Sequence, residues 1–143
     1  MPGVGDTARE FVEAFNAHDE QRIRDGYAEN AVYEAPGVRV EGRDAATEYA
    51  MSFVRGFPDV RLTITNQVEA GDWVALEVSF EGTHQGTLEG PGGVIPATNR
   101  RVTGKGAEFI RIEEGKVVEE HLYFDQIDFL TQLGVMEQEA ATA

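Results

Sequence analysis

The chain has 143 residues, no cysteine and a formal net charge of −14 at neutral pH. This length suits a single domain, the lack of cysteine excludes disulfides and thiolate metal sites, and the negative charge makes nucleic acid and anionic membranes poor partners. No apolar run reaches the roughly 20 residues of a membrane span. Residues 1–6 lack the features of a signal peptide, so we expect a cytoplasmic protein.

The first part of the chain predicts three helices. Residues 7–10 (TARE) have the pattern of a capping box, and apolar residues follow at helical spacing. Asp19 is placed to cap a short second helix that continues through Tyr27. Asp44 is placed to cap a third helix, which Gly56 and the following Pro58 end.

The remainder predicts extended structure and one short terminal helix. The expected strands are residues 31–34, 60–69, 73–81, 101–112 and 116–125. Turns are expected at 70–72 and 113–115, and a glycine- and proline-rich loop near a pocket mouth is expected at 82–96. Gly134 ends the terminal helix, and residues 136–143 are expected to be disordered. Helices followed by antiparallel strands predict one α+β domain over residues 1–143, with its core at about 6–135 and helices packed on a curved sheet around an apolar pocket.

Several segments together resemble the SnoaL-like polyketide cyclase family of the nuclear transport factor 2 superfamily. They are FVEAFNAHD at 11–19, YAENAVYEAPG at 27–37, FPD at 57–59, GTH at 82–84, GKVVE at 115–119 and QLG at 132–134. The resemblance implies a cone-shaped fold, a homodimer formed through the sheet, and no cofactor. It also implies intramolecular aldol closure of a polyketide ring, with an aspartate as acid and base.

The last strand carries the candidate chemistry. Simple alternation places Val117, Glu119, His121, Tyr123 and Asp125 on one face, which we expect to line the pocket. A carboxylate in an apolar pocket loses hydration, so its pKa rises toward neutrality and it can transfer protons. Asp125 matches the position of the family's catalytic aspartate and is the candidate general acid and base. The alternative is that Asp125 only caps the terminal helix.

His121 stands where the family commonly has tryptophan. It is the second candidate catalytic residue, able to orient a carbonyl or share a proton, and the alternative is a structural histidine bonded to Glu119 or to a backbone group. Tyr123 is a candidate donor to an oxyanion or, alternatively, a packing residue.

Further candidates for substrate contact are acidic or aromatic. Glu108 lies between apolar residues of a strand, where a buried acid must be paired or protonated, although an exposed bulge is the alternative. Glu34 lies where the family carries a polar pocket residue. The aromatic candidates for the pocket wall are Phe15, Tyr33, Tyr49, Phe53 and Trp73. The three histidines are far apart, so no metal site is expected.

The sequence and the resemblance together predict a cofactor-independent enzyme of the cyclase or isomerase type. It is expected to act by acid and base catalysis on a hydrophobic, carbonyl-bearing, polyketide-like small molecule. The alternatives are a non-catalytic binding or dimerisation module, or a relative that hydrolyses epoxides or dehydrates its substrate. The polar outer residues Glu77, Ser79 and Glu81 suit a hydrated dimer interface.

Overall fold

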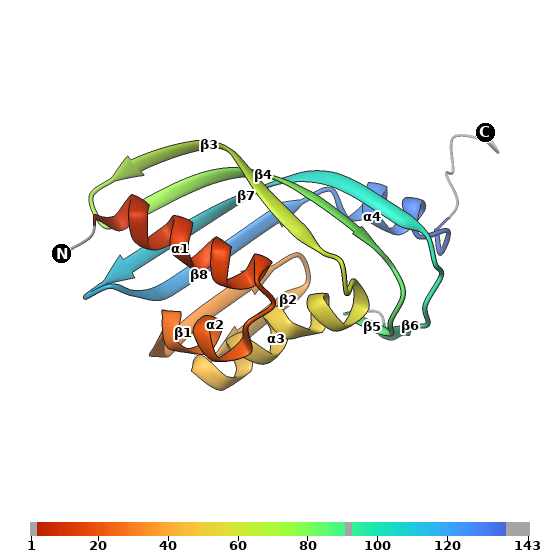
Figure 1. Ribbon diagram of the computed structural model, residues 1–143, viewed down its shortest axis with the longest axis horizontal. Coiled ribbons are helices and arrows are strands. Elements are labelled where there is room, and N and C mark those ends of the chain that lie inside the picture. Colours follow the sequence, from red (N-terminus) through yellow and green to blue (C-terminus); the bar gives the residue numbers. More distant parts are fainter. Residues whose placement is uncertain (1–2, 91–92, 137–143) are drawn as a thin grey trace.

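The computed structural model describes residues 3–90 and 93–136 (Figure 1). The chain forms these helices and strands in order: α1 (Val4–Asn16), α2 (Glu20–Gly26), β1 (Tyr27–Ala35), β2 (Val38–Glu41), α3 (Arg43–Gly56), β3 (Arg61–Ala70), β4 (Trp73–Thr83), β5 (Leu88–Gly90), β6 (Gly93–Ile95), β7 (Arg101–Glu113), β8 (Lys116–Phe124) and α4 (Gln126–Gln132). The predicted disorder of residues 137–143 concerns residues outside those described. Among the described residues, no helix is long and apolar enough to cross a membrane.

Six strands form one sheet in the order β2-β1-β8-β7-β4-β3. The β1–β8 pair is parallel and the other neighbours are antiparallel. Helices α1, α2 and α3 cover one face of this sheet, and the long strands β4 and β7 extend beyond them on the side of α4 (Figure 1). The arrangement confirms the predicted α+β class, with helices on a large, mostly antiparallel sheet.

The helix starts agree only in part with the sequence patterns. Asp19 caps α2 as predicted, because its carboxylate accepts a hydrogen bond from the Arg22 backbone N–H at 3.1 Å. The predicted capping box at residues 7–10 is wrong, since α1 already begins at Val4 after Gly3. The cap at Asp44 is also wrong. Gly42 takes that position with φ of 97°, a conformation that glycine adopts without strain.

Strand β8 contains a bulge that inverts the expected alternation. Ile112 of β7 pairs with Val117, whereas the preceding Arg111 pairs with Glu119, so Val118 is an extra residue on β8. Val117 and Val118 are both buried. Beyond the bulge, Glu120 faces the helices, and Glu119 faces away from them. The prediction that His121 and Tyr123 share a pocket-facing side with Val117 is therefore wrong.

The segment predicted as a loop at residues 82–96 is more ordered than expected. Strand β4 extends to Thr83, and β5 pairs with β6 in a small separate hairpin; Pro91 and Gly92 lie outside the described residues. Gly86 anchors the segment, because its backbone N–H donates to the Gly56 carbonyl at 3.1 Å. A Cβ atom on Gly86 would lie 2.0 Å from the Arg55 carbonyl oxygen, so only glycine fits there.

Candidate active site

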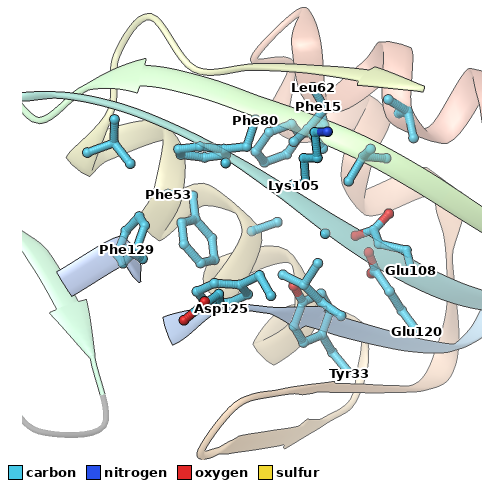
Figure 2. A pocket seen from close by; sticks show the side chains of 18 of the residues that line it. Phe15, Tyr33, Phe53, Leu62, Phe80, Lys105, Glu108, Glu120, Asp125 and Phe129 are labelled. Carbon is cyan, nitrogen blue, oxygen red and sulfur yellow. The ribbon is translucent and has the colours of Figure 1, made fainter. Parts of the chain in front are cut away.

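A largely apolar cavity lies between the helices and the sheet. The cavity volume is about 130 Å³, and the cavity opens to solvent at one end. Helix α1 contributes Phe11, Val12 and Phe15, and α3 contributes Ala50 and Phe53. Strands β4, β7 and β8 form the opposite wall (Figure 2). The sequence prediction that Phe15, Tyr33 and Phe53 line the pocket therefore agrees with the geometry.

Carboxyl groups mark both ends of this cavity. At the inner end, Glu108 and Glu120 are only 5% and 4% exposed. At the other end, Asp125 and Asp128 line the cavity but are exposed to solvent, so this end is the mouth. Figure 2 shows the Glu108 and Glu120 carboxyl groups close together and well separated from Asp125. The cavity thus has a buried acidic end and a solvated acidic end, with apolar walls between them.

Register explains why the two inner glutamates meet. On β7 and β8, Glu108 pairs with Leu122 and Ile110 pairs with Glu120, so the glutamates are diagonal neighbours on the same face. Diagonal neighbours in an antiparallel pair are within reach of long side chains. Tyr33 of β1 is the register partner of Glu120 on its other side.

Burial changes the protonation of this acidic end. Desolvation raises the pKa of Glu120 well above its usual value, and the nearby charge of Glu108 raises it further. Desolvation also raises the pKa of Glu108, while a hydrogen bond with Glu120 opposes that rise. Tyr27 donates a hydrogen bond to Glu120 Oε1 at 2.6 Å. The pair therefore retains a proton more readily than two solvated glutamates would.

Asp125 both lines the mouth and caps α4. Its Oδ1 accepts a hydrogen bond from the Asp128 backbone N–H at 2.9 Å. The cap expected from the sequence is therefore present, and it coincides with a position on the cavity wall. The second carboxylate oxygen is free of any hydrogen bond from the described residues.

Three polar candidates lie on the opposite, outer face of the sheet. His121 packs beside Trp73 with ring centroids 6.0 Å apart, and its Nδ1 lies 3.5 Å from Glu34 Oε2. Tyr123 is 57% exposed and contacts Phe109. None of these side chains lines the cavity. The prediction that His121, Tyr123, Glu34 and Trp73 line the pocket is therefore wrong. The bulge in β8 places His121 and Tyr123 on the outer face, where Glu34 and Trp73 also lie as register partners of His121 and Arg111.

Tyr49 supports the wall from behind. Its ring packs on Tyr33 and Phe53 with centroids 4.9 and 5.4 Å apart, but it does not itself line the cavity. Burial raises the pKa of the Tyr49 hydroxyl. Tyr49 thus holds two wall residues in place, and the prediction that it lines the cavity itself is wrong.

Sequence reasoning missed Glu120 and Tyr27 as cavity residues. The available signal was the apolar pair Leu122 and Phe124, which marks the core-facing side of β8 and assigns Glu120 to that side by alternation. For Tyr27 no clear signal existed, because the residue was assigned to the end of a helix. Within residues 3–90 and 93–136, no group of three or more potential ligand side chains is arranged to hold a metal ion.

The fold and cavity define a small α+β domain with an enclosed apolar site and carboxyl groups at both ends. The sequence profile of the SnoaL-like polyketide cyclase family matches residues 6–133. The chain belongs to this family, as its sequence motifs predicted.

Named relatives agree with this assignment. The chain is 36% identical over 66 residues to the aklanonic acid methyl ester cyclases DnrD of Streptomyces peucetius and DauD of Streptomyces sp. strain C5. That segment is 46% of this chain and covers only 43% and 38% of the two relatives, less than half of their length.

Solved structures match over nearly the whole chain. IdmH from Streptomyces antibioticus, a candidate polyketide cyclase, has a TM-score of 0.77 and 28% identity, covering 94% of this chain and 100% of that one. AclR from Streptomyces galilaeus, a candidate hydroxylase, has a TM-score of 0.79 and 25% identity, covering 94% and 97%. One fold thus accompanies two different suggested activities.

Proposed function

We propose that this protein is a cofactor-independent cyclase that closes a ring in a hydrophobic, carbonyl-bearing small molecule. The observation that carries the proposal is Asp125, a carboxylate at the mouth of a cavity whose walls are otherwise largely apolar. Membership of the cyclase family supports the same class of chemistry. A polyketide-like substrate fits because its rings are apolar and its carbonyl groups acidify the neighbouring C–H bonds.

The proposed reaction is an intramolecular aldol addition. The Asp125 carboxylate removes a proton from a carbon next to a carbonyl, and the resulting enolate carbon attacks a second carbonyl of the same molecule. A carbon–carbon bond forms, and the proton returns from Asp125 to the new alkoxide oxygen. Asp125 ends the cycle in the protonation state in which it began. Positioned acid–base catalysis of this kind raises the rate by about 10²- to 10⁴-fold.

The test uses Asp125→Asn with aklanonic acid methyl ester, the compound in the names of the two curated relatives. Asparagine caps helices as well as aspartate does, so α4 keeps its start while the proton-transfer group is lost. We expect turnover to fall by about 10²- to 10⁴-fold. The matched control is Asp19→Asn, which changes the equivalent cap of α2 and leaves turnover unchanged. Turnover of Asp125→Asn at the wild-type rate contradicts the mechanism.

A non-catalytic binding module is the second candidate. The solvent exposure of Asp125 and its use as a helix cap favour this function. Such a module would retain a bound aromatic ligand without converting it, and binding would be insensitive to Asp125→Asn. Product formation by the wild-type protein separates the two candidates.

The outer sheet face supports a homodimer as the working assembly. Phe109 and Tyr123 are 45% and 57% exposed there, and their rings meet at 6.1 Å. Arg111 and Glu119 lie on the same face and form an ion pair at 2.8 Å. A surface with exposed aromatic rings and charges of both signs suits pairing with a second copy of itself about a two-fold axis.

A further inference from the structure

The inner end of the cavity holds a polar group that the proposed reaction at Asp125 does not use. Glu108 is 5% exposed, lines the cavity, and accepts no hydrogen bond from any described residue outside its pairing with Glu120. No lysine, arginine or histidine nitrogen of the described residues lies within 4.0 Å of either carboxyl group. A buried carboxyl group without such a partner is costly, so its presence at the cavity wall points to a ligand.

The neighbours of this pair leave it open to the cavity. The Tyr27 hydroxyl donates its hydrogen bond to Glu120 Oε1. Tyr33 of β1 is the register partner of Glu120 and lines the cavity beside the pair. Figure 2 shows both carboxyl groups at the end of the hollow, beyond Tyr33. The remaining carboxyl oxygens can therefore meet an atom of a molecule that fills the cavity.

The protonation of the pair decides which atoms it can meet. Because burial raises the pKa of both carboxyl groups, the pair keeps a proton to higher pH than two solvated glutamates would. A protonated carboxyl group donates a hydrogen bond to a carbonyl oxygen, and its ionised partner accepts one from a hydroxyl group. Lys105 lines the same cavity, but its ammonium group makes no ion pair with either glutamate. A carboxylate ligand at the pair would therefore bring a further negative charge to a place with no cationic nitrogen of the described residues within 4.0 Å.

We propose that Glu108 and Glu120 form a binding subsite for an uncharged oxygen group of the ligand, a carbonyl or a hydroxyl, and that this subsite discriminates against a carboxylate. The subsite rests on the proposed function in one respect, because it requires that the cavity takes a small aromatic or polyketide-like molecule.

The distance between the two ends of the cavity limits the shape of a ligand that reaches both. Glu120 and Asp125 are five residues apart along β8 and its end, which corresponds to about 16 Å in an extended strand. A ligand that reaches both ends is therefore elongated. It presents one oxygen group to the glutamate pair and its reacting carbon to Asp125.

The experiment compares two probes that share a ring system and differ in charge. 2-Acetonaphthone carries an uncharged carbonyl group, and 2-naphthoate carries a carboxylate at the same ring position. Equilibrium dialysis at pH 7 measures the dissociation constant of each probe with the full chain. We expect 2-naphthoate to bind at least about tenfold more weakly, since a like charge close to a buried carboxylate is strongly unfavourable.

Amide variants separate this subsite from the general cost of placing an anion in an apolar cavity. In Glu108→Gln we expect the preference for 2-acetonaphthone over 2-naphthoate to fall, because one of the two acidic groups is removed. In Glu108→Gln/Glu120→Gln we expect it to fall at least about fivefold, because no like charge is left at the subsite. The single variant removes no hydrogen bond to Tyr27 and keeps the test usable if the double variant is unstable. Glu119→Gln, one residue away on the outer face, is the matched control and keeps the wild-type preference.

Each outcome decides between the two proposals. Equal affinity of the wild-type protein for both probes overturns the subsite alone, as does a preference that the amide variants leave unchanged. Failure of both probes to bind overturns the subsite together with the proposed ligand class. Loss of turnover in Asp125→Asn with no probe discrimination leaves the proposed reaction standing and removes only the subsite.

Discussion

The Tyr27 hydroxyl lies 2.6 Å from Glu120 Oε1, and this buried hydrogen bond joins the start of β1 to β8 at the inner end of the cavity. Burial raises the pKa of the Tyr27 hydroxyl, and the charge of Glu120 raises it further, so the phenol stays protonated and donates. The same bond favours the ionised form of Glu120 and opposes the effect of burial on its pKa. Two buried polar groups thus partly satisfy each other.

We expect Tyr27→Phe to lower the free energy of unfolding by about 1–2 kcal/mol at neutral pH, because Glu120 loses its phenol donor in a dry environment. Phenylalanine keeps the ring contact with Phe11, whose centroid lies 4.9 Å away. Equilibrium unfolding in urea measures the change. Tyr123→Phe removes an exposed hydroxyl and serves as control, with an expected change within about 0.5 kcal/mol. Equal stability of Tyr27→Phe and wild type contradicts the prediction.

The acid pair also predicts how stability depends on pH. Because the pKa values of Glu108 and Glu120 are raised in the folded state, the folded protein binds more protons than the unfolded chain above the ordinary value of 4.5. The stabilisation is complete below that value and is lost as the pH rises through the folded-state pKa. Glutamine mimics the neutral acid and does not titrate.

We therefore expect Glu120→Gln to gain stability relative to wild type as the pH rises above the ordinary glutamate value of 4.5. Urea unfolding at a series of pH values measures this difference. Glu119→Gln is the control and shows no such gain, since Glu119 is ion-paired with Arg111 on the outer face. A difference between Glu120→Gln and wild type that stays constant with pH rules out a shifted acid pair.

Helix caps show what local chemistry can predict. Asp19 and Asp125 both cap helices in the structure, as expected from a short polar side chain just before a helical segment. Asp44 also precedes a helical pattern, yet Gly42 is the N-cap residue of α3. The backbone between β2 and α3 has a φ of 97° at Gly42. Such a backbone angle depends on tertiary geometry, which local sequence does not contain.

The candidate site depends on a feature that local sequence describes even less well. The alternation rule assigned His121 to the pocket because it counted from Val117, and the single extra residue Val118 reverses the faces beyond it. A bulge depends on pairing with β7 and is not encoded by the residues of β8 alone. Glu108 lies on β7, and of the two alternatives that its sequence left open, a buried acid and an exposed bulge, the structure has the buried acid.

The burial of His84 predicts that the free energy of unfolding falls at acidic pH. His84 is fully buried, its Nδ1 accepts a hydrogen bond from the Thr98 backbone N–H at 3.2 Å, and its Nε2 has no hydrogen-bond partner among the described residues. Burial lowers the pKa of its imidazole below the usual 6.5. The unfolded chain therefore takes up a proton that the folded protein resists, and stability falls as the pH drops below about 6.5.

In His84→Asn, the side-chain oxygen can replace Nδ1 as acceptor for Thr98 but does not titrate. We expect this variant to be less stable than wild type at neutral pH, because a buried ring is lost, with a difference that narrows as the pH falls from about 7 to about 5. His18→Asn is the histidine control, since His18 is only partly buried. A gap between His84→Asn and wild type that stays the same over this range contradicts the prediction.

The outer sheet face gives a prediction about assembly. Phe109 is 45% exposed in the centre of the sheet, beside Tyr123. If a second copy covers this face, Phe109→Glu places two carboxylates near the two-fold axis of a dimer that is already strongly anionic. We expect sedimentation analysis to show a dimer for wild type and at least about a tenfold weaker dimer for Phe109→Glu, because charges at an interface core are strongly unfavourable. The control Val94→Glu changes an exposed apolar residue of the β5–β6 hairpin, 62% exposed, and leaves the dimer intact. A dimer that tolerates Phe109→Glu places the interface elsewhere, and a wild-type monomer contradicts the proposed dimer itself.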